Sequence, residues 1–401
     1  MSRSEGLVSP LNVLTITPFF PSDQNEVAGC FVAEPMEQFE NLGIESSVIA
    51  VSSIYHRRKR SIRSAPADWV RYLQCPPGIL GLSSAGKFLF RRLLPRVEKL
   101  HRAKPIDDIH AHSALPCGLA AALLSKKLNI PFVVTVHGLD VFNTCSHTGI
   151  AAAWRRQASV YVYRAARSVI CVSARVQEIL QARMQAGISS DVVYNGVDPT
   201  LFSPLPANAE VLPAEILVVG QLLPSKGHEL VLRAVGILKS TFPLIRCTVI
   251  GEGLYRAQFE ALASELRIEE DVRFAGRKSR IEVAEAMRNC TIFVLPSRNE
   301  GLGCVYLEAM SCGKPIIACR GQGIEGVIEH GENGWLIPGD AQEDLVKVLS
   351  ALLASSDLRG RIGYAARQTI LEKLTLSHQA QNLISVYRQS VRQKLCDPSK
   401  N

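Results

Sequence analysis

The feature that most constrains the fold is an alternation of short apolar, β-branched runs with segments of helical character. In the first half of the chain, strands are predicted over 11–20, 46–52, 107–113, 131–138, 168–173 and 191–196. Helices are predicted between them over 29–43, 114–129, 151–166 and 174–186. Because successive parallel strands need a crossover connection that is usually a helix, this order predicts a parallel sheet covered on both faces.

A second alternating set follows a break in the pattern. The segment "NGVDPTLFSPLP" (195–206) contains Gly and three prolines and is predicted to be the interdomain linker. Strands are then predicted over 215–220, 245–251, 272–276, 291–297, 315–319 and 334–339, with helices over 226–240, 254–266, 280–288 and 302–312 and a helical tail from 341. A chain of 401 residues exceeds one ordinary core. We therefore expect two doubly wound domains, with ligands in a cleft at the carboxyl ends of their strands.

Composition places the chain among soluble globular proteins, with 47% apolar and 20% charged residues. The 11 cysteines form no C-x-x-C pair, which favours free thiols in a reducing compartment. The longest uncharged apolar stretch, 113–125, is shorter than the ~20 residues of a spanning helix. Glu5 and Pro10 precede the first apolar run and do not fit a signal peptide. These features predict a cytoplasmic protein.

The formal net charge of +8 comes mainly from the first half of the chain. Basic residues concentrate in "HRRKR" (56–60) and in the series from Lys87 to Lys104. Such a surface can attract anionic lipid head groups at the inner face of a membrane, and it can equally be a solvated basic face. Nucleic acid is not expected as a partner, because no aromatic residues interleave the run.

Two glutamates with seven residues between them are candidate site residues. Glu300 follows a predicted strand and precedes Gly301 and Gly303, whose backbone N–H groups are uncovered at a helix start. Glu308 lies within that helix, so one carboxylate is available for each end of an extended ligand. A capping glutamate followed by a solvated helix glutamate is the alternative interpretation.

Two further residues follow predicted strands. Lys226, in "LPSKG", lies at the start of a helix, where it can reach an anion held by the helix dipole. His137, in "TVHGLD", follows a strand of the first domain. Each has an ordinary alternative, a helical first turn for Lys226 and a hydrogen-bonded structural histidine for His137.

Taken in order, the motifs of the chain resemble those of the retaining glycosyltransferases of family 4, which have the GT-B fold. The resemblance extends over roughly 11–345 and rests on "TPFFPSDQNEVAGCFVAEPMEQFENLG", "DDIHAH", "TVHGLD", "NGVD", "VVGQLLPSKG", "VIGEG" and "VLPSRNEGLGCVYLEAMSCGKPIIAC". It implies two Rossmann-like domains that face a central cleft. The acceptor-side domain would span 1–198, completed by a C-terminal helix near 375–395, and the nucleotide-sugar domain would span 205–372.

The resemblance also implies roles for individual residues. Glu308 matches the glutamate that accepts hydrogen bonds from the nucleotide ribose, and Glu300 matches the one that contacts donor sugar hydroxyls. Lys226 matches the lysine of the donor diphosphate. The remaining matches are His137, which borders the donor sugar, Gly29 of the first loop, Gly301, Leu302 and Gly303 beside Glu300, and the weaker candidates Asn195, Ser173 and Glu252.

One position departs from the family pattern. Gln221 stands where the family usually has an arginine beside the lysine, so one cation for the leaving diphosphate is missing. Either Arg256 or Arg298 substitutes for it, or activity is low. Ala28 precedes Gly29 where many members have a second glycine.

The activity implied is transfer of a hexosyl unit from a UDP- or GDP-sugar to a glycan or lipid-linked acceptor, with retention, in bacterial surface polysaccharide synthesis. No cofactor and no metal is expected, since "DDI" lacks the D-x-D spacing. Two alternatives stay open: a nucleotide-sugar epimerase of the same fold, and a catalytically impaired partner that binds nucleotide or lipid, which Gln221 suggests. A Rossmann oxidoreductase is disfavoured, because Arg256 occupies the third glycine position of "VIGEGLYR".

Overall fold

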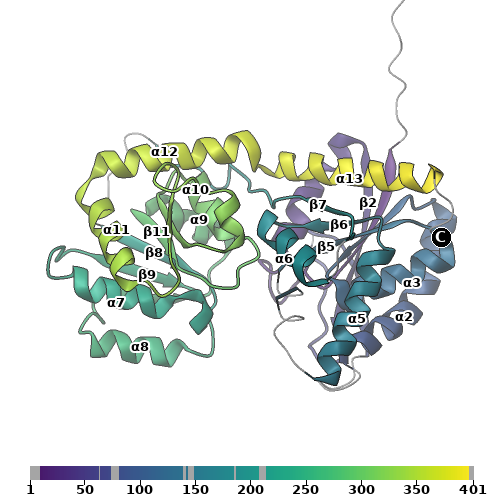
Figure 1. The fold of residues 1–401 in the computed structure, drawn as a ribbon, viewed down its shortest axis with the longest axis horizontal. Helices are drawn as coiled ribbons and strands as arrows, with labels where there is room; N and C mark the ends of the chain where they lie inside the picture. The colour runs from purple at the N-terminus through teal and green to yellow at the C-terminus, as the bar shows by residue number, and fades with distance from the viewer. Residues whose placement is uncertain are drawn as a thin grey trace, which may run out of the picture. The chain divides into compact units, whose positions relative to one another are not determined.

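The computed structural model describes residues 10–62, 64–73, 81–138, 141–142, 149–184, 187–206 and 214–396. The chain forms two compact units (Figure 1). The N-terminal unit comprises Met1–Tyr194 together with Gln379–Asn401, and the C-terminal unit comprises Asn195–His378. The end of the chain therefore returns to the unit in which it began.

The N-terminal unit is built on a seven-stranded parallel sheet in the order β3-β2-β1-β4-β5-β6-β7. Its strands are β1 Leu11–Thr17, β2 Ile44–Ser53, β3 Asp68–Tyr72, β4 Asp108–His112, β5 Phe132–Val136, β6 Ser168–Cys171 and β7 Ser190–Val192. The strand order reverses between β1 and β4, so the loops after these two strands diverge to opposite faces of the sheet. Ligands of open α/β sheets bind at such a switch point.

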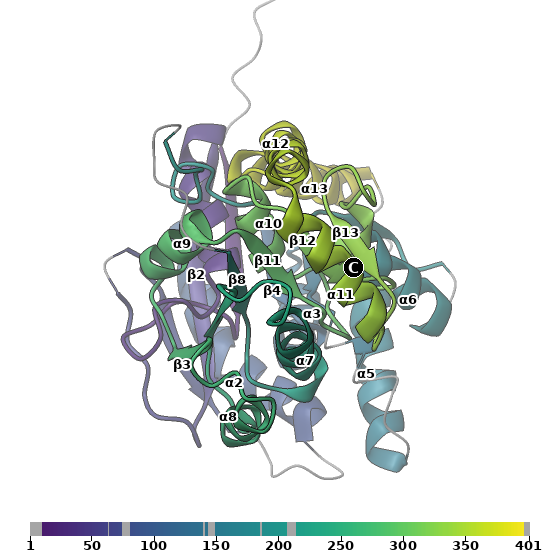
Figure 2. The ribbon, with the colours of Figure 1, turned by 90° about the vertical axis from the view of Figure 1, so that its left-hand side faces the viewer.

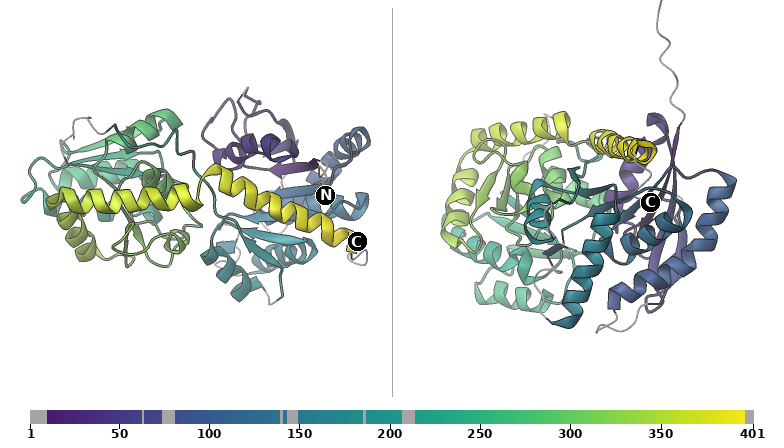
Figure 3. Two further views of the ribbon diagram at one scale, coloured as in Figure 1. Left: turned by 90° about the horizontal axis from the view of Figure 1, so that it is seen from above. Right: turned by 45° about the vertical axis from the view of Figure 1, so that its right-hand side comes forward.

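Both faces of this sheet are covered. The helices α2 Gly81–Ala103, α3 Leu119–Leu128 and α5 Ile150–Ala165 pack together on one face (Figure 1). The C-terminal helix α13 Leu376–Cys396 lies along the other face (Figure 3). There Tyr387 and Ile384 pack against Val13 of β1 and Val133 of β5 in one buried cluster. The C-terminal helix is thus part of the core of the N-terminal unit.

The single helix predicted over 29–43 is wrong in form. The structure divides this segment into α1 Cys30–Ala33 and two 3-10 helices, η1 Glu34–Gln38 and η2 Glu40–Leu42. Pro35 lacks the N–H that a continuous α-helix would use and instead occupies the start of η1. Gly43 ends the segment as predicted, in the left-handed conformation with φ of 76°.

The C-terminal unit has a six-stranded parallel sheet in the order β10-β9-β8-β11-β12-β13. Its strands are β8 Glu215–Val219, β9 Arg246–Ile250, β10 Val272–Gly276, β11 Ile292–Leu295, β12 Ile316–Cys319 and β13 Trp335–Ile337. One face carries α7 His228–Leu238, α8 Arg256–Glu265 and α11 Gln342–Ala354, and the other carries α9 Arg280–Asn289, α10 Cys304–Ser311 and α12 Ser356–Lys373 (Figures 1 and 2). Both sheets therefore have the predicted doubly wound architecture.

The segment predicted as a linker, 195–206, packs against the C-terminal unit. Phe202 is fully buried, and its backbone oxygen accepts a 2.6 Å hydrogen bond from Ser311. Arg288 donates to the backbone oxygen of Leu201, and Val197 forms a β-bridge with Thr375. Among the described residues, no helix is both long and apolar enough to span a bilayer.

Candidate functional site

The loops after β8 and β11 touch each other at the carboxyl edge of the C-terminal sheet. Gly227 makes this contact possible: it has φ of 74°, and a Cβ atom there would lie 2.4 Å from the backbone oxygen of Pro296. The Arg298 N–H donates to the backbone oxygen of Ser225 at 2.7 Å and ties the two loops together. A larger residue at 227 would push the β8 loop away from β11.

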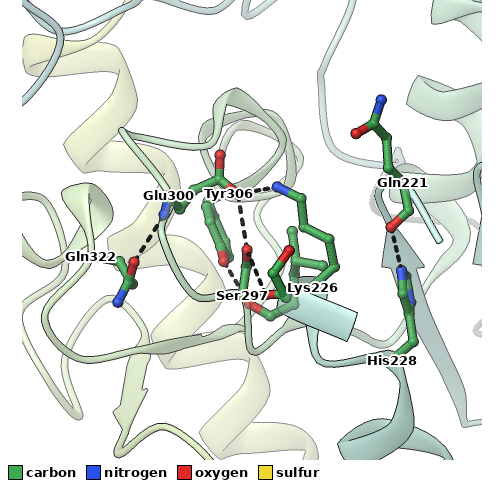
Figure 4. Close-up of polar contacts among 9 residues, drawn as sticks. Gln221, Lys226, His228, Ser297, Glu300, Tyr306 and Gln322 are labelled. Atoms are coloured by element: carbon green, nitrogen blue, oxygen red, sulfur yellow. Dashed lines mark hydrogen bonds and ion pairs between the residues drawn. The ribbon is translucent and has the colours of Figure 1, made fainter. Parts of the chain in front are cut away.

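The contact between these loops brings Lys226 and Glu300 into an ion pair (Figure 4). About a fifth of each side chain is exposed, 22% for Lys226 and 18% for Glu300. Ser297 donates to the same Glu300 oxygen at 3.0 Å, and the Glu300 N–H donates to Gln322 Oε1 at 2.9 Å. The carboxylate is therefore held in one orientation by side chains from two loops, with part of its surface open to a ligand.

The predicted Gly301–Gly303 turn leads directly into α10. Gly303 has φ of 81° and caps α10, and a Cβ atom there would lie 2.6 Å from the ring of Tyr306. Tyr306 is buried and donates to the backbone oxygen of Leu295 at 2.5 Å, which anchors α10 to the end of β11. Leu302 is buried, so only its backbone is suited to contact a ligand. The N-cap residue of α10 is Gly303 itself, which has no side chain that could cap the helix.

Glu308 lies inside α10 and is almost completely buried. It forms an ion pair with Arg280, the first residue of α9. The Arg280 guanidinium lies 4.8 Å above the ring of Phe202, which belongs to the segment packed on this unit. A buried carboxylate needs such a partner, because an uncompensated charge in the interior is strongly unfavourable. Arg280 is therefore a further candidate site residue, one that the sequence analysis missed.

The residues that could replace the missing arginine are already paired. Arg256 donates to Glu252 at 3.0 Å and to Glu260 at 2.8 Å, so the predicted site residue Glu252 is engaged in this pair. Arg298 donates to Asp340 at 2.7 Å. The side chain of Gln221 is exposed and lies to one side of the Lys226–Glu300 pair (Figure 4).

The backbone of Gln221 has a structural partner. Its oxygen lies 2.9 Å from Nε2 of the buried His228. Burial lowers the pKa of His228, so this ring is neutral at neutral pH and donates from Nε2 to the Gln221 oxygen. The bond depends on the backbone alone, and the side chain at 221 is free to differ from that of the family.

Two predicted residues belong to the N-terminal unit. Gly29 has φ of 77°, and a Cβ atom there would lie 2.3 Å from the carbonyl carbon of Phe19, so only glycine fits. His137, directly after β5, lies 5.3 Å from the ring of Phe19 and 5.0 Å from that of Phe31. Its Nε2 lies 3.0 Å from Nδ1 of His112, at the end of β4. Burial lowers the pKa of His137 to about 4.

The weaker candidates have local roles in the structure. Ser173 is buried, and its hydroxyl accepts from the Val176 N–H at the start of α6 Ala174–Met184. Asn195 is buried and lies 3.2 Å from Sγ of Cys304, the first residue of α10. Among the described residues, no group of three His, Cys, Asp or Glu side chains is placed to hold a metal ion.

Comparison with known proteins gives two family matches. Residues 31–201 match the model of Glycosyltransferase Family 4, and residues 208–369 match that of Glycosyl transferases group 1. An uncharacterized glycosyltransferase of Methanocaldococcus jannaschii is 32% identical over 263 residues, which cover 64% of this chain and 68% of the relative. The chain belongs to the group 1 glycosyltransferases.

Other relatives and solved structures agree with this assignment. The D-inositol 3-phosphate glycosyltransferase of Stackebrandtia nassauensis is 27% identical to this glycosyltransferase, covering 74% of the chain and 71% of the relative. The sucrose-phosphate synthase of Thermosynechococcus elongatus superposes with a TM-score of 0.75 at 18% identity, over 94% of this chain and 98% of that one. HepE of Anabaena, solved in complex with UDP, superposes with a TM-score of 0.73 at 19% identity, over 94% of this chain and 100% of that one. The predicted GT-B fold class, with two Rossmann-like parallel-sheet domains, is confirmed.

Proposed function

We propose that this glycosyltransferase moves a hexosyl group from a UDP- or GDP-sugar to a glycan or lipid-linked acceptor. The observation that carries the proposal is the Lys226–Glu300 pair at the carboxyl edge of the C-terminal sheet. A cation at a helix start suits a diphosphate, and a fixed carboxylate suits sugar hydroxyls. The solved structures of HepE with UDP and with UDP-glucose support a nucleotide-sugar donor.

Donor binding exchanges the partners of this pair. The diphosphate carries two negative charges and takes the Lys226 ammonium, whose charge then stabilises the leaving nucleoside diphosphate. Glu300 is left with its Ser297 hydrogen bond and accepts from donor sugar hydroxyls. The ion pair keeps both groups charged and oriented before the donor arrives, so little reorganisation is needed during the reaction.

The Arg280–Glu308 pair suits the ribose of the donor. The Arg280 guanidinium engages Glu308 Oε1. A carboxylate has about four acceptor positions, so Glu308 retains acceptor capacity for ribose hydroxyls while it stays neutralised by Arg280. Arg280 thus allows the Glu308 carboxylate to stay buried and still accept hydrogen bonds from the ribose.

Retention at the anomeric carbon completes the proposal. The acceptor hydroxyl attacks from the face that the leaving group vacates, and a phosphate oxygen of the leaving group takes its proton. No second carboxylate is then required as a nucleophile, in contrast to retaining glycosidases. Lys226 supplies the positive charge that a metal ion would otherwise provide, so we expect transfer to continue in the presence of EDTA.

The acceptor is proposed to be presented at a membrane, in bacterial surface polysaccharide synthesis. The basic segment Arg57–Arg60 follows Ile54 and Tyr55, which are exposed at 41% and 65%. Arg57, Arg58 and Arg60 are exposed as well. Such a surface should bind anionic vesicles in a salt-sensitive way, and neutralising 57–60 should weaken binding. Equal binding by the neutralised variant would contradict the membrane part of the proposal.

A catalytically impaired nucleotide-binding partner is a second candidate function. It is favoured by Gln221, which carries no charge. Arg256 and Arg298 already donate to carboxylates, so Lys226 is left as the proposed cation for the diphosphate. An epimerase of the same fold is the third candidate, and product analysis separates it, because it would interconvert sugar nucleotides without any acceptor.

The test is release of nucleoside diphosphate from a panel of UDP- and GDP-sugars, with and without glycan and lipid-linked acceptors. The anomeric configuration of the product is read by NMR. Acceptor-dependent release with retention supports the proposal. Nucleotide binding without release from any donor would favour the impaired partner, and inversion would exclude the retaining mechanism.

A further inference from the structure

A seam of polar side chains lies inside the N-terminal unit. Asp108, His110 and His112 alternate along β4, so they share one face of the strand, and all three are buried. The C-terminal helix α13 covers this face and contributes Tyr387. Buried polar groups are costly, and a row of them along a central strand is a candidate for a role beyond stability.

The seam ends at the proposed donor-site residue. His112 Nδ1 lies 3.0 Å from Nε2 of His137, and the planes of the two rings are nearly parallel, with an interplanar angle of 17°. His112 is itself held by the ring of His110, whose centroid is 4.3 Å away. His110 is fixed at both nitrogens, by Tyr387 at 2.7 Å and by Thr135 at 2.6 Å.

The hydrogen bond between the two histidines allows only two arrangements. Burial lowers the pKa of His137 to about 4 and that of His112 well below its usual value, so both rings are neutral. One proton lies between Nδ1 of His112 and Nε2 of His137. If His137 donates it, both rings are Nε2–H tautomers, the form that a free histidine side chain prefers; if His112 donates it, both are the less stable Nδ1–H tautomers.

We propose that His112 is a positioning residue that holds His137 as the Nε2–H tautomer, so that Nδ1 of His137 is a hydrogen-bond acceptor for a hydroxyl of the donor sugar or acceptor. The inference rests on the proposed role of His137 at the donor sugar. His137 Nε2 is occupied by His112, which leaves Nδ1 as the ring nitrogen for a ligand. The order of the seam, from Tyr387 through His110 to His112, keeps this ring orientation rigid.

The direct test is the 15N spectrum of the His137 ring in the full-length protein without donor. The expected result is a protonated Nε2 and an unprotonated Nδ1 at neutral pH. Since this measurement needs no catalytic turnover, it separates the tautomer assignment from the proposed function. A protonated Nδ1 in the wild-type protein would overturn the inference, whatever the variants do.

Two substitutions of His112 test whether the tautomer depends on this residue. His112→Phe keeps a ring against His110 but removes the acceptor for His137, and His112→Asn keeps an oxygen near the position of Nδ1. We expect His112→Phe to give a mixture of His137 tautomers and to lower kcat by about tenfold or more, with a smaller change in the donor KM. His112→Asn should restore most of the wild-type tautomer and rate.

Tyr387→Phe is the matched control within the seam. It removes a buried hydroxyl from His110 but leaves the His112–His137 bond in place. We expect lower thermal stability with the wild-type His137 spectrum. An unchanged His137 spectrum in folded His112→Phe would overturn the inference. If that variant does not fold, either of two other results would overturn it: an Nδ1–H signal from His137 in the wild-type protein, or an altered His137 tautomer in His112→Asn.

Discussion

The two units place polar groups at their sheets in opposite ways. The C-terminal unit uses charged pairs: Lys226 with Glu300 on the loops after β8 and β11, and Arg280 with Glu308 between two helices. The N-terminal unit uses neutral rings in a buried seam that ends at His137. A diphosphate requires cations, whereas orientation of a sugar hydroxyl requires only a fixed acceptor. Under the proposed function, the charged pairs would bind the leaving diphosphate and the neutral rings would orient the reacting sugar.

The largest effect is expected from Lys226→Ala. The substitution removes the cation proposed for the leaving diphosphate and leaves Glu300 without its ion-pair partner. Loss of such a stabilising group typically costs about 3–4 kcal/mol in the transition state, so kcat/KM should fall by roughly 10²–10³. Lys347→Ala, at an exposed position of α11, is the matched control in nucleoside diphosphate release. Equal rates for the two variants would remove Lys226 from the site.

The neutral seam should make stability depend on pH in a specific way. The folded-state pKa values are about 3 for His110, about 4 for His137 and well below the usual value for His112, so the unfolded chain binds more protons below pH ~6.5. Their contribution to stability is present above pH ~6.5 and is lost as the pH falls. Burial raises the pKa of Asp108 to about 8, so its folded form keeps a proton that the unfolded chain releases, and its contribution falls as the pH rises toward 8.

These opposite terms predict maximal stability of the N-terminal unit near pH ~6.5. Between pH ~6.5 and ~5.5, the three histidines destabilise the fold more than the one aspartate stabilises it. The free energy of unfolding should therefore fall by about 2 kcal/mol. Asp108→Asn should flatten the alkaline side and steepen the acid side, because the aspartate that partly offsets the histidines no longer titrates. Urea unfolding followed over pH checks both limbs, and a stability that rises steadily from pH 6.5 to 8 in the wild type would contradict the assignment of Asp108.

Gln221→Arg tests the C-terminal unit by an expected gain of activity, whereas Lys226→Ala tests it by an expected loss. The substitution adds the cation that the family usually has, and the His228 bond survives because it uses the backbone oxygen of residue 221. We expect kcat to rise by about tenfold, equivalent to ~1.4 kcal/mol. Arg298→Ala, whose partner is Asp340, should have little effect in the same assay. A large loss in Arg298→Ala would instead identify Arg298 as the replacement cation.

The smallest effect is expected when one buried tyrosine in each unit is replaced by phenylalanine. Tyr387→Phe and Tyr306→Phe each remove one hydrogen bond, to His110 and to the Leu295 backbone oxygen respectively. Each should lower the free energy of unfolding by about 1–2 kcal/mol. Tyr306→Phe should also raise the donor KM, because Tyr306 anchors the helix that follows Glu300. Thermal unfolding and donor titration measure the two effects, and an unchanged KM would show that the α10 anchor has no part in donor binding.

Local patterns in the sequence predicted what depends on neighbouring residues. The alternation of strands and helices predicted both parallel sheets, and the end of the segment 29–43 could be placed at Gly43 because a strand follows it. The break of 29–43 at Pro35 was missed, since a proline is also compatible with the first turn of a helix. The positions of Lys226 and Glu300 could be predicted from the ends of strands.

Partners that are distant in sequence could not be predicted. Gln322 reaches the Glu300 N–H from the loop after β12, and Arg280 reaches Glu308 from another helix. His112 meets His137 because β4 pairs with β5 with His112 opposite Thr135, two residues before His137. Strand order and register determine these contacts, and local periodicity predicts neither of them. The motif "DIHAH" was the signal for His112, since it places two histidines on one face of a strand.

The account is tested most directly by calorimetric titration of UDP and GDP into wild type, Lys226→Ala and His137→Phe at two salt concentrations. It predicts that Lys226→Ala weakens binding of the preferred nucleotide by about tenfold or more and reduces its salt dependence, while His137→Phe binds that nucleotide like the wild type. Wild-type affinity in Lys226→Ala, or a loss confined to His137→Phe, would contradict the division between a charged unit that grips the diphosphate and a neutral one that orients the sugar.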